Sequence, residues 1–372
     1  MRVAFWADML YYRIAGGTTR YAARLSVELS RLSNINLRLF SLYSREVIAR
    51  LAQERQCPAA ENIPSHLPRQ LHYLLWLTGW AGRSAGMMDD ADVVHVPWIA
   101  VPPHGRAPLV VTVLDLIFLL FPDYHNRRTR WTARMGLSRA SRQAAAFISI
   151  SHNTADDLMR LTGIPKHKIY VTPLAAEDYF RPVPYSKIRK RYGLEGPFVL
   201  YVGTLEPRKN LITLVRAFAA LDDPGLKLVI AGKKGWMYQD LFAIVEKLGL
   251  TSRVIFTGFV SDTDLPALYS AAQVFVYPSL YEGFGLPILE AMQCGTPVIT
   301  TNVSSLPEVS GDAALLVAPD NVRELSAAMR RILAEPGLRE ELRGRGFKRS
   351  QCFSWRKTAE LTADVYRQVC RQ

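Results

Sequence analysis

This 372-residue chain lacks the marks of several special classes of protein. It has no low-complexity tract and no repeat of solenoid period. No apolar run reaches the ~20 residues of a membrane span, since the best candidate, 109–121, is interrupted by Asp115. Its start resembles a first strand rather than a signal peptide. The four cysteines show no metal-like spacing, and we expect reduced thiols in a cytoplasmic protein: Cys57, Cys294, Cys352 and Cys370.

Charge is unevenly distributed along the chain, whose net charge is +13. Residues 101–150 contain seven arginines against two aspartates, and Trp131 lies among the arginines of 127–142. A solvated helix face explains this run in the simplest way. The functional alternative is a surface for anionic lipid or for an acidic acceptor. We do not expect a nucleic-acid partner, because no recognition motif accompanies the charge.

Strand-like and helix-like segments alternate along the whole chain, which predicts an α/β protein with parallel sheets. The length favours two domains. Two prolines in 181–185 indicate a linker. We therefore predict two Rossmann-like, doubly wound domains at 1–180 and 181–352, with a last helix in 353–372. Ligands of such folds bind at the carboxyl ends of the strands, so the loops that follow strands are the candidate sites.

The stretch 281–290 contains two carboxylates, Glu282 and Glu290, on either side of a glycine-rich turn. A helix is predicted to begin near Leu286, and its positive end would face the turn. Backbone amides of such a turn suit phosphate oxygens, and carboxylates accept hydrogen bonds from hydroxyl groups. The pattern therefore favours a polyol that carries a diphosphate. A glycosidase acid pair is disfavoured, because Glu290 would lie a full turn into the helix.

A second candidate loop, 201–210, joins a buried strand to a helix. Arg208 and Lys209 lie in it, where a diphosphate is expected, although adjacent basic residues in a loop are often simply solvated. Their presence in the same half as Glu282 favours phosphate binding.

Three weaker candidates follow other predicted strands. Gly16 and Gly17 would bring backbone close to a phosphate, although they do not form a G-x-G-x-x-G motif and a plain turn fits equally well. The backbone of 257–260 would face a nucleobase. His95 and Asp115 end strands of the first half, and a lone histidine is more often structural. Asp262-Thr263-Asp264 resembles a metal-binding D-x-D, but we expect no metal there.

Taken in order, these motifs resemble the retaining glycosyltransferases of the GT-B fold, specifically glycosyltransferase family four. The resemblance is dense over 165–335. It is carried by 203–210, 231–236, 256–258, 282–290, 295–298 and 306–309. It implies two Rossmann-like domains that face a central cleft, with the donor held mainly by the second domain and the acceptor side in the first. The C-terminal helix, beginning near Trp355, would cross back to the N-terminal domain.

The resemblance also implies roles for residues. Glu290 corresponds to the ribose ligand, Glu282 to the sugar contact, and Arg208 with Lys209 to the diphosphate clamp. The catalytic set is completed by Asp115. Other donor-binding positions are Gly16, Gly17, Thr204, Gly258, Phe259, Val260, Phe284, Gly285, Leu286 and Pro287. One departure is notable, since Leu114 stands where many relatives have a histidine.

The expected activity is retaining, metal-independent transfer of a hexose from a nucleotide-sugar to a glycan or lipid-linked glycan. GDP-mannose is the favoured donor, and no cofactor is expected because the donor is a substrate. Three alternatives stay open: a UDP-hexose donor, a non-catalytic nucleotide-sugar-binding protein, and a sugar phosphorylase or epimerase of the same architecture. The basic run 127–142 adds the expectation of peripheral contact with an anionic membrane.

Overall fold

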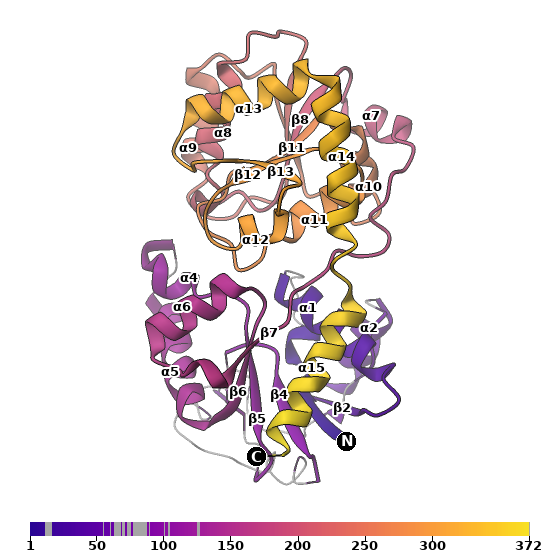
Figure 1. Ribbon diagram of the computed structural model, residues 1–372, viewed down its shortest axis with the longest axis vertical. Helices are drawn as coiled ribbons and strands as arrows, with labels where there is room; N and C mark the ends of the chain where they lie inside the picture. The colour runs from indigo at the N-terminus through magenta and orange to yellow at the C-terminus, as the bar shows by residue number, and fades with distance from the viewer. Residues whose placement is uncertain are drawn as a thin grey trace. The chain divides into compact units, whose positions relative to one another are not determined.

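The computed structural model describes most of the chain (Figure 1): residues 1–11, 17–54, 56–59, 61–62, 68, 71–72, 76, 88, 90–99, 101–102, 105–124 and 127–371. It divides into two compact units. Unit 1 comprises Met1–Leu174 together with Trp355–Gln372, and unit 2 comprises Ala175–Ser354. None of the described helices is both long and apolar enough to cross a membrane.

Unit 1 is built on a parallel sheet with the strand order β3-β2-β1-β4-β5-β6-β7. Its central strands are buried on both faces, as expected of runs rich in Val, Ile and Phe between two helical layers. The strands are β1 (Arg2–Trp6), β2 (Asn36–Ser41), β3 (Glu61–Asn62), β4 (Val93–Val96), β5 (Leu109–Val113), β6 (Ala144–Ser149) and β7 (Ile169–Val171).

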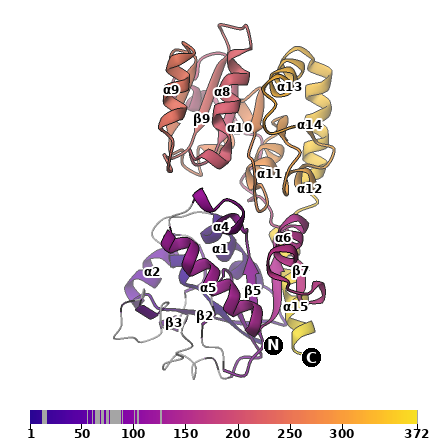
Figure 2. The same ribbon diagram turned by 90° about the vertical axis from the view of Figure 1, so that its left-hand side faces the viewer.

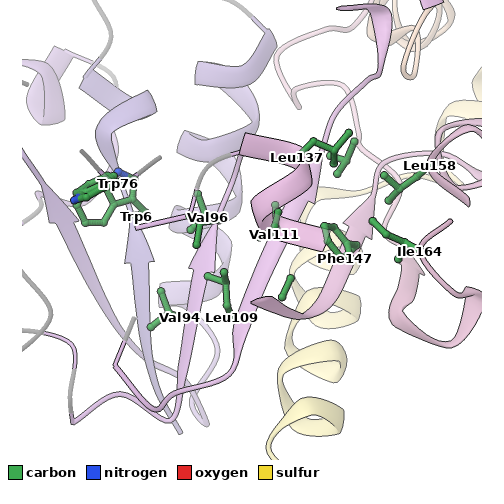
Figure 3. Packing of buried hydrophobic residues seen from close by; sticks show 14 of the residues in the cluster. Trp6, Trp76, Val94, Val96, Leu109, Val111, Leu137, Phe147, Leu158 and Ile164 are labelled. Atoms are coloured by element: carbon green, nitrogen blue, oxygen red, sulfur yellow. The ribbon is translucent and has the colours of Figure 1, made fainter. Parts of the chain in front are cut away.

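Apolar side chains of β1, β4, β5 and β6 meet those of α5 (Arg127–Gln143) and α6 (His152–Thr162) in one buried cluster (Figure 3). Trp6 packs edge-on against Trp76, with ring centroids 4.8 Å apart. The described helices are η1 (Asp8–Tyr11), α1 (Gly17–Ser30), α2 (Arg45–Glu54), α4 (Ile117–Leu120), η4 (Pro122–Tyr124), α5 (Arg127–Gln143), α6 (His152–Thr162), η5 (Lys166–Lys168) and α15 (Trp355–Val369). The last of these, α15, packs against α1 and β6, so the far end of the chain completes unit 1.

Unit 2 has a second parallel sheet, with the strand order β10-β9-β8-β11-β12-β13. Its strands are β8 (Phe198–Val202), β9 (Lys227–Ala231), β10 (Val254–Gly258), β11 (Val274–Tyr277), β12 (Val298–Thr301) and β13 (Ala314–Val317). Successive connections run outward in one direction from β8 and in the other from β11. The order therefore reverses between these two neighbours, and a ligand site is expected there.

Helices cover both faces of this sheet, with α8 packed against α9 and α13, and α11 against α10 and α14 (Figure 2). They are α7 (Ser186–Tyr192), η6 (Pro207–Lys209), α8 (Leu211–Ala219), α9 (Gln239–Lys247), α10 (Leu265–Ala271), α11 (Leu286–Gln293), α12 (Leu306–Ser310), α13 (Val322–Ala334) and α14 (Pro336–Ser350). The predicted linker 181–185 has no helix or strand and leads into α7.

Candidate functional site

The loops that follow β8 and β11 lie side by side at the point where the strand order of unit 2 reverses. Asn210 joins them, because its side-chain amide donates to the carbonyl of Pro278, directly after β11, at 3.1 Å. The same amide donates to the carbonyl of Pro319, in the loop after β13, at 2.5 Å. Asn210 adopts a left-handed conformation, with φ 57°, between η6 and α8. The backbone amide of Leu280 also donates to the carbonyl of Arg208 at 2.9 Å. These bonds fix the first loop against the second.

Charged side chains of the two loops converge on the carboxylate of Glu282. Lys209 Nζ lies 2.6 Å from Glu282 Oε1, and Arg208 Nη1 lies 2.8 Å from Oε2. Lys209 also donates to the hydroxyl of Tyr277 at 2.7 Å, and Arg208 Nη2 lies 2.5 Å from Glu206 Oε1. The predicted clamp residues and the predicted sugar contact therefore form one buried ionic cluster.

Burial and pairing have opposite effects on the charge of Glu282, which is 8% exposed. Burial by itself would raise the pKa of its carboxyl group, but Arg208 and Lys209 hold that pKa at about 2. Burial followed by the charge of Arg208 lowers the pKa of Lys209, while Glu282 acts to raise it. Burial would also lower the pKa of Arg208, and Glu282 and Glu206 more than reverse this. Glu282 is therefore ionised at neutral pH.

The glycine-rich turn after Glu282 is held by two serines. Ser305 Oγ donates to the carbonyl oxygens of Glu282 at 2.9 Å and Phe284 at 2.8 Å, and the amide of Glu282 donates to Ser304 Oγ at 3.0 Å. Gly285 is the N-cap of α11, has φ 109°, and makes no side-chain cap bond. Pro287 lies in the first turn of α11, where it suits the helix start.

Glu290 lies further along α11 and is directed elsewhere. It is 3% exposed, and its Oε2 accepts a hydrogen bond from the hydroxyl of Tyr269 at 3.0 Å. The structure thus gives the two carboxylates of the motif different surroundings, one cationic and one phenolic.

Close backbone packing shapes the loops that follow β8 and β9. A Cβ at Gly232 would lie 1.8 Å from the carbonyl oxygen of Gly203, and one at Gly235 would lie 2.8 Å from Thr204 Cγ2. Gly258 ends β10 with φ 70°. Phe259 is 74% exposed, whereas Val260 is buried, so the predicted base-binding stretch alternates between surface and core.

The candidates from the first half lie in unit 1. Gly17 begins α1, Gly16 lies outside the described residues, and Asp115 Oδ1 accepts from the amide of Ile117 at 3.2 Å. His95 is fully buried, with Nδ1 2.6 Å from the Tyr366 hydroxyl and Nε2 2.8 Å from Thr112 Oγ1. Burial lowers the pKa of His95 to about 3, so its ring is neutral. These partners give His95 a structural setting.

Sequence reasoning missed four residues of the unit 2 cluster. Glu206 and Tyr277 contact the cations, and Ser304 and Ser305 hold the turn. Glu206 was recognisable as an acidic residue two positions before Arg208, whereas the others required the tertiary structure.

In the D-x-D segment 262–264, Asp264 is paired with protein side chains. Asp264 Oδ2 accepts from the hydroxyl of Tyr192 at 3.0 Å and lies 2.8 Å from Arg191 Nη1. Across the described ranges, no three His, Cys, Asp or Glu side chains gather in a way that would hold a metal ion.

Comparison with known proteins defines the class. The model of "Glycosyltransferase Family 4" matches residues 15–177, and that of "Glycosyl transferases group 1" matches residues 185–349. The chain is 37% identical over 273 residues to the O-antigen chain mannosyltransferase B of Escherichia coli, covering 71% of each chain. It is 33% identical to the serotype-specific mannosyltransferase WbdA of Escherichia coli over 60% of this chain and 29% of that longer protein.

The structure of Anabaena Alr3699/HepE in complex with UDP-glucose shows the same fold. It is 20% identical, has a TM-score of 0.77, and is matched over 99% of this chain and all of that one. The fold is therefore GT-B, and the protein is a glycosyltransferase of the hexosyltransferase class. The chain belongs to glycosyltransferase family four, and the predicted fold and family are confirmed.

Proposed function

We propose that this enzyme is a retaining mannosyltransferase that uses GDP-mannose and extends a glycan or lipid-linked glycan. The observation that carries the proposal is the cationic cluster around Glu282, which lies at the switch point of the unit 2 sheet and directly before α11. The choice of mannose rests on the mannosyltransferase relatives, and polysaccharide synthesis rests on the O-antigen role named for one of them.

In the proposed complex, unit 2 holds the donor. The backbone of 284–287 and the start of α11 meet the diphosphate, Glu282 accepts hydrogen bonds from sugar hydroxyls, and Glu290 binds the ribose. Thr204 and 258–260 line the nucleotide. The roles that the resemblance assigns to Gly16, Gly17 and Asp115 of unit 1 stay predictions.

The chemistry proposed follows from where charge develops. Departure of the nucleoside diphosphate places negative charge on phosphate oxygens, which Lys209 and the amides of α11 would stabilise. This positive field is supplied by the protein itself, so we propose that the reaction needs no metal. Attack from the face that the phosphate leaves, with phosphate taking the acceptor proton, would retain the anomeric configuration.

A UDP-hexose donor is the second candidate, and the fold neighbour in complex with UDP-glucose favours testing it. A non-catalytic binder is less well supported, because Glu282, Lys209 and Arg208 are present and paired. A phosphorylase or an epimerase would require different substrates, a free phosphate or no acceptor at all.

A panel of nucleotide-sugars separates these candidates. Each is tested for binding by thermal shift and for transfer or slow hydrolysis by product release. GDP-mannose is expected to stabilise the protein and be consumed, and Glu282→Gln to lower turnover by about 100-fold or more, as loss of a transition-state contact does. Glu246→Gln, on the exposed face of α9, is the matched control. Binding and turnover of UDP-glucose in place of GDP-mannose would overturn the donor assignment.

We also propose that α5 contacts an anionic membrane. The exposed side of this helix carries Arg127, Arg128, Trp131, Arg134, Met135 and Arg142. Trp131 is 52% exposed, and within the described chain no arginine of α5 forms an ion pair with an acidic side chain. Arginines beside an exposed tryptophan suit an interface of anionic headgroups and acyl chains. A lipid-linked acceptor would be presented at such a surface.

A further inference from the structure

The guanidinium of Arg208 is engaged at both terminal nitrogens by protein oxygens. Nη1 lies 2.8 Å from Glu282 Oε2 and donates to the carbonyl of Tyr281 at 2.6 Å. Nη2 lies 2.5 Å from Glu206 Oε1. The Arg208 and Glu282 side chains are each 11% exposed, and that of Glu206 is 4% exposed. Arg208 therefore lies inside a bridge between two carboxylates.

Glu206 has a clear physical task in this bridge. A carboxylate that is almost fully buried is costly unless it is paired, and Arg208 is its ion-pair partner. Glu206 and Arg208 flank Pro207, whose ring restricts the backbone at the start of η6. The Glu206 contact orients the planar guanidinium so that its other side meets Glu282. A lysine cannot reproduce this, because its ammonium is a single point of charge.

Lys209 is placed differently. Among the described residues its ammonium donates to Tyr277 and to Glu282, at 2.7 and 2.6 Å. An ammonium has three N–H donors, so one remains for a ligand oxygen. Lys209 is thus equipped to serve Glu282 and a phosphate at the same time.

We propose that Glu206 and Arg208 are positioning residues, which fix the carboxylate of Glu282, and that Lys209 with the start of α11 meets the diphosphate. Arg208 then acts on the donor through Glu282 rather than as a direct clamp. This inference rests on the proposed function, in which Glu282 holds the transferred sugar, and it changes the role that the resemblance gave to Arg208.

The two roles differ in which part of the donor they affect. Dissociation constants are measured by calorimetry for GDP and for GDP-mannose, with UDP and UDP-glucose in parallel, and kcat and KM are measured for the sugar that is transferred. Variants are Glu206→Gln, Arg208→Lys and Lys209→Gln, with Glu246→Gln as control. Gln at position 206 keeps the shape and an acceptor oxygen, and thermal melting confirms that each variant is folded.

If Arg208 positions Glu282, Glu206→Gln and Arg208→Lys leave the affinity for the nucleoside diphosphate within about twofold. They lower the affinity for the nucleotide-sugar, or lower kcat, by roughly 10- to 100-fold, the usual range for a charged hydrogen bond. Lys209→Gln lowers the affinity for the nucleoside diphosphate itself. Combining Glu206→Gln with Arg208→Lys adds little further loss, because both break one bridge.

The inference is overturned if Arg208→Lys lowers the affinity for the nucleoside diphosphate as much as Lys209→Gln does, since Arg208 would then contact the diphosphate directly. It is also overturned if Glu206→Gln leaves binding and kcat unchanged. The proposed function fails in a different way, namely if the unmodified enzyme neither binds nor turns over any nucleotide-sugar.

Discussion

At the scale of single residues, Glu282 shows how burial and pairing together determine a charge. Its carboxylate is 8% exposed and would be neutralised by burial, yet two cations within 2.8 Å keep it ionised. The site therefore holds a fixed negative charge next to fixed positive ones. A carboxylate that can accept from a hydroxyl group therefore lies next to an ammonium that can donate to a phosphate oxygen.

This arrangement predicts a specific dependence of stability on pH. The pKa of Glu282 is about 2 in the folded protein, against an ordinary value of 4.5. A lowered pKa stabilises the folded state above the ordinary value, and this contribution is lost as pH falls toward the folded value. Wild type should lose stability faster than Glu282→Gln once pH drops below about 4.5. Urea unfolding from pH 6 to 3 measures this, and parallel curves would contradict it.

Gly285 sets the conformation of the turn before α11. Its φ of 109° is unfavourable for a residue with a side chain, and an added Cβ would lie 2.9 Å from Leu306 Cδ2. Gly285→Ala should cost about 1–3 kcal/mol of unfolding free energy and lower activity by displacing the start of α11. Gly337→Ala in α14, where nothing lies within 4 Å of the added Cβ, is the control. Equal stability of the two variants, by denaturant titration, would refute this account of the turn.

At the scale of elements, periodicity predicted the strands and long helices well. The sequence predicts strands at 198–202, 227–231 and 314–317 and a helix at 355–369, and β8, β9, β13 and α15 have these bounds. Helix α11 begins at Leu286, where the motif indicated. Helices α2, α7 and α12 were missed, and α7 and α12 have only one or two turns, which carry too little periodicity. The sequence also predicts a helix at 68–81, and most of that range lies outside the described residues.

The site was predictable to a similar degree. Since loops after neighbouring parallel strands meet at one edge, Arg208, Lys209 and Glu282 were expected near one another. Which side chain pairs with which was not predictable. The sequence does not show whether Arg208 pairs with a ligand or with Glu206, because this depends on the tertiary structure. The setting of His95 depends on Tyr366, a partner 271 positions away.

The exposed face of α5 predicts binding to anionic vesicles. Cosedimentation with vesicles of phosphatidylcholine and phosphatidylglycerol should be strong at low salt and weak without the anionic lipid. Replacing Arg128 and Arg134 together with Gln should weaken binding by about 2 kcal/mol, roughly 30-fold.

Replacing two exposed basic residues of unit 2, Arg323 and Lys247, with Gln is the matched control. Equal loss in both double variants would point to net charge rather than to α5. Tighter binding to RNA than to the vesicles would identify a nucleic-acid surface instead.

At the scale of the whole molecule, each unit has a core of its own, and α15 belongs to the first. The hydroxyl of Tyr366 satisfies buried His95, which is bonded in turn to Thr112. Tyr366→Phe should cost about 1–3 kcal/mol, because it leaves a buried ring nitrogen without its partner.

The loss should be confined to unit 1. Hydrogen exchange is expected to quicken in β4, β5 and α1 while β8–β13 keep their protection, since separate cores open separately. Asp364→Asn is the control on the same helix, because Asp364 is an exposed partner of Arg367 and its replacement should leave both units unchanged. Uniform acceleration across both units would show that they unfold as one.

The return of α15 to unit 1 also has a consequence for biosynthesis. The ribosome makes Met1–Leu174 first, then all of unit 2, and only afterwards Trp355–Val369. During that interval the surface of α1 that packs against α15 is exposed, and His95 lacks the hydrogen bond that Tyr366 later makes with it. Unit 2 is continuous in sequence and can fold as it emerges, so the domain translated first is the one completed last.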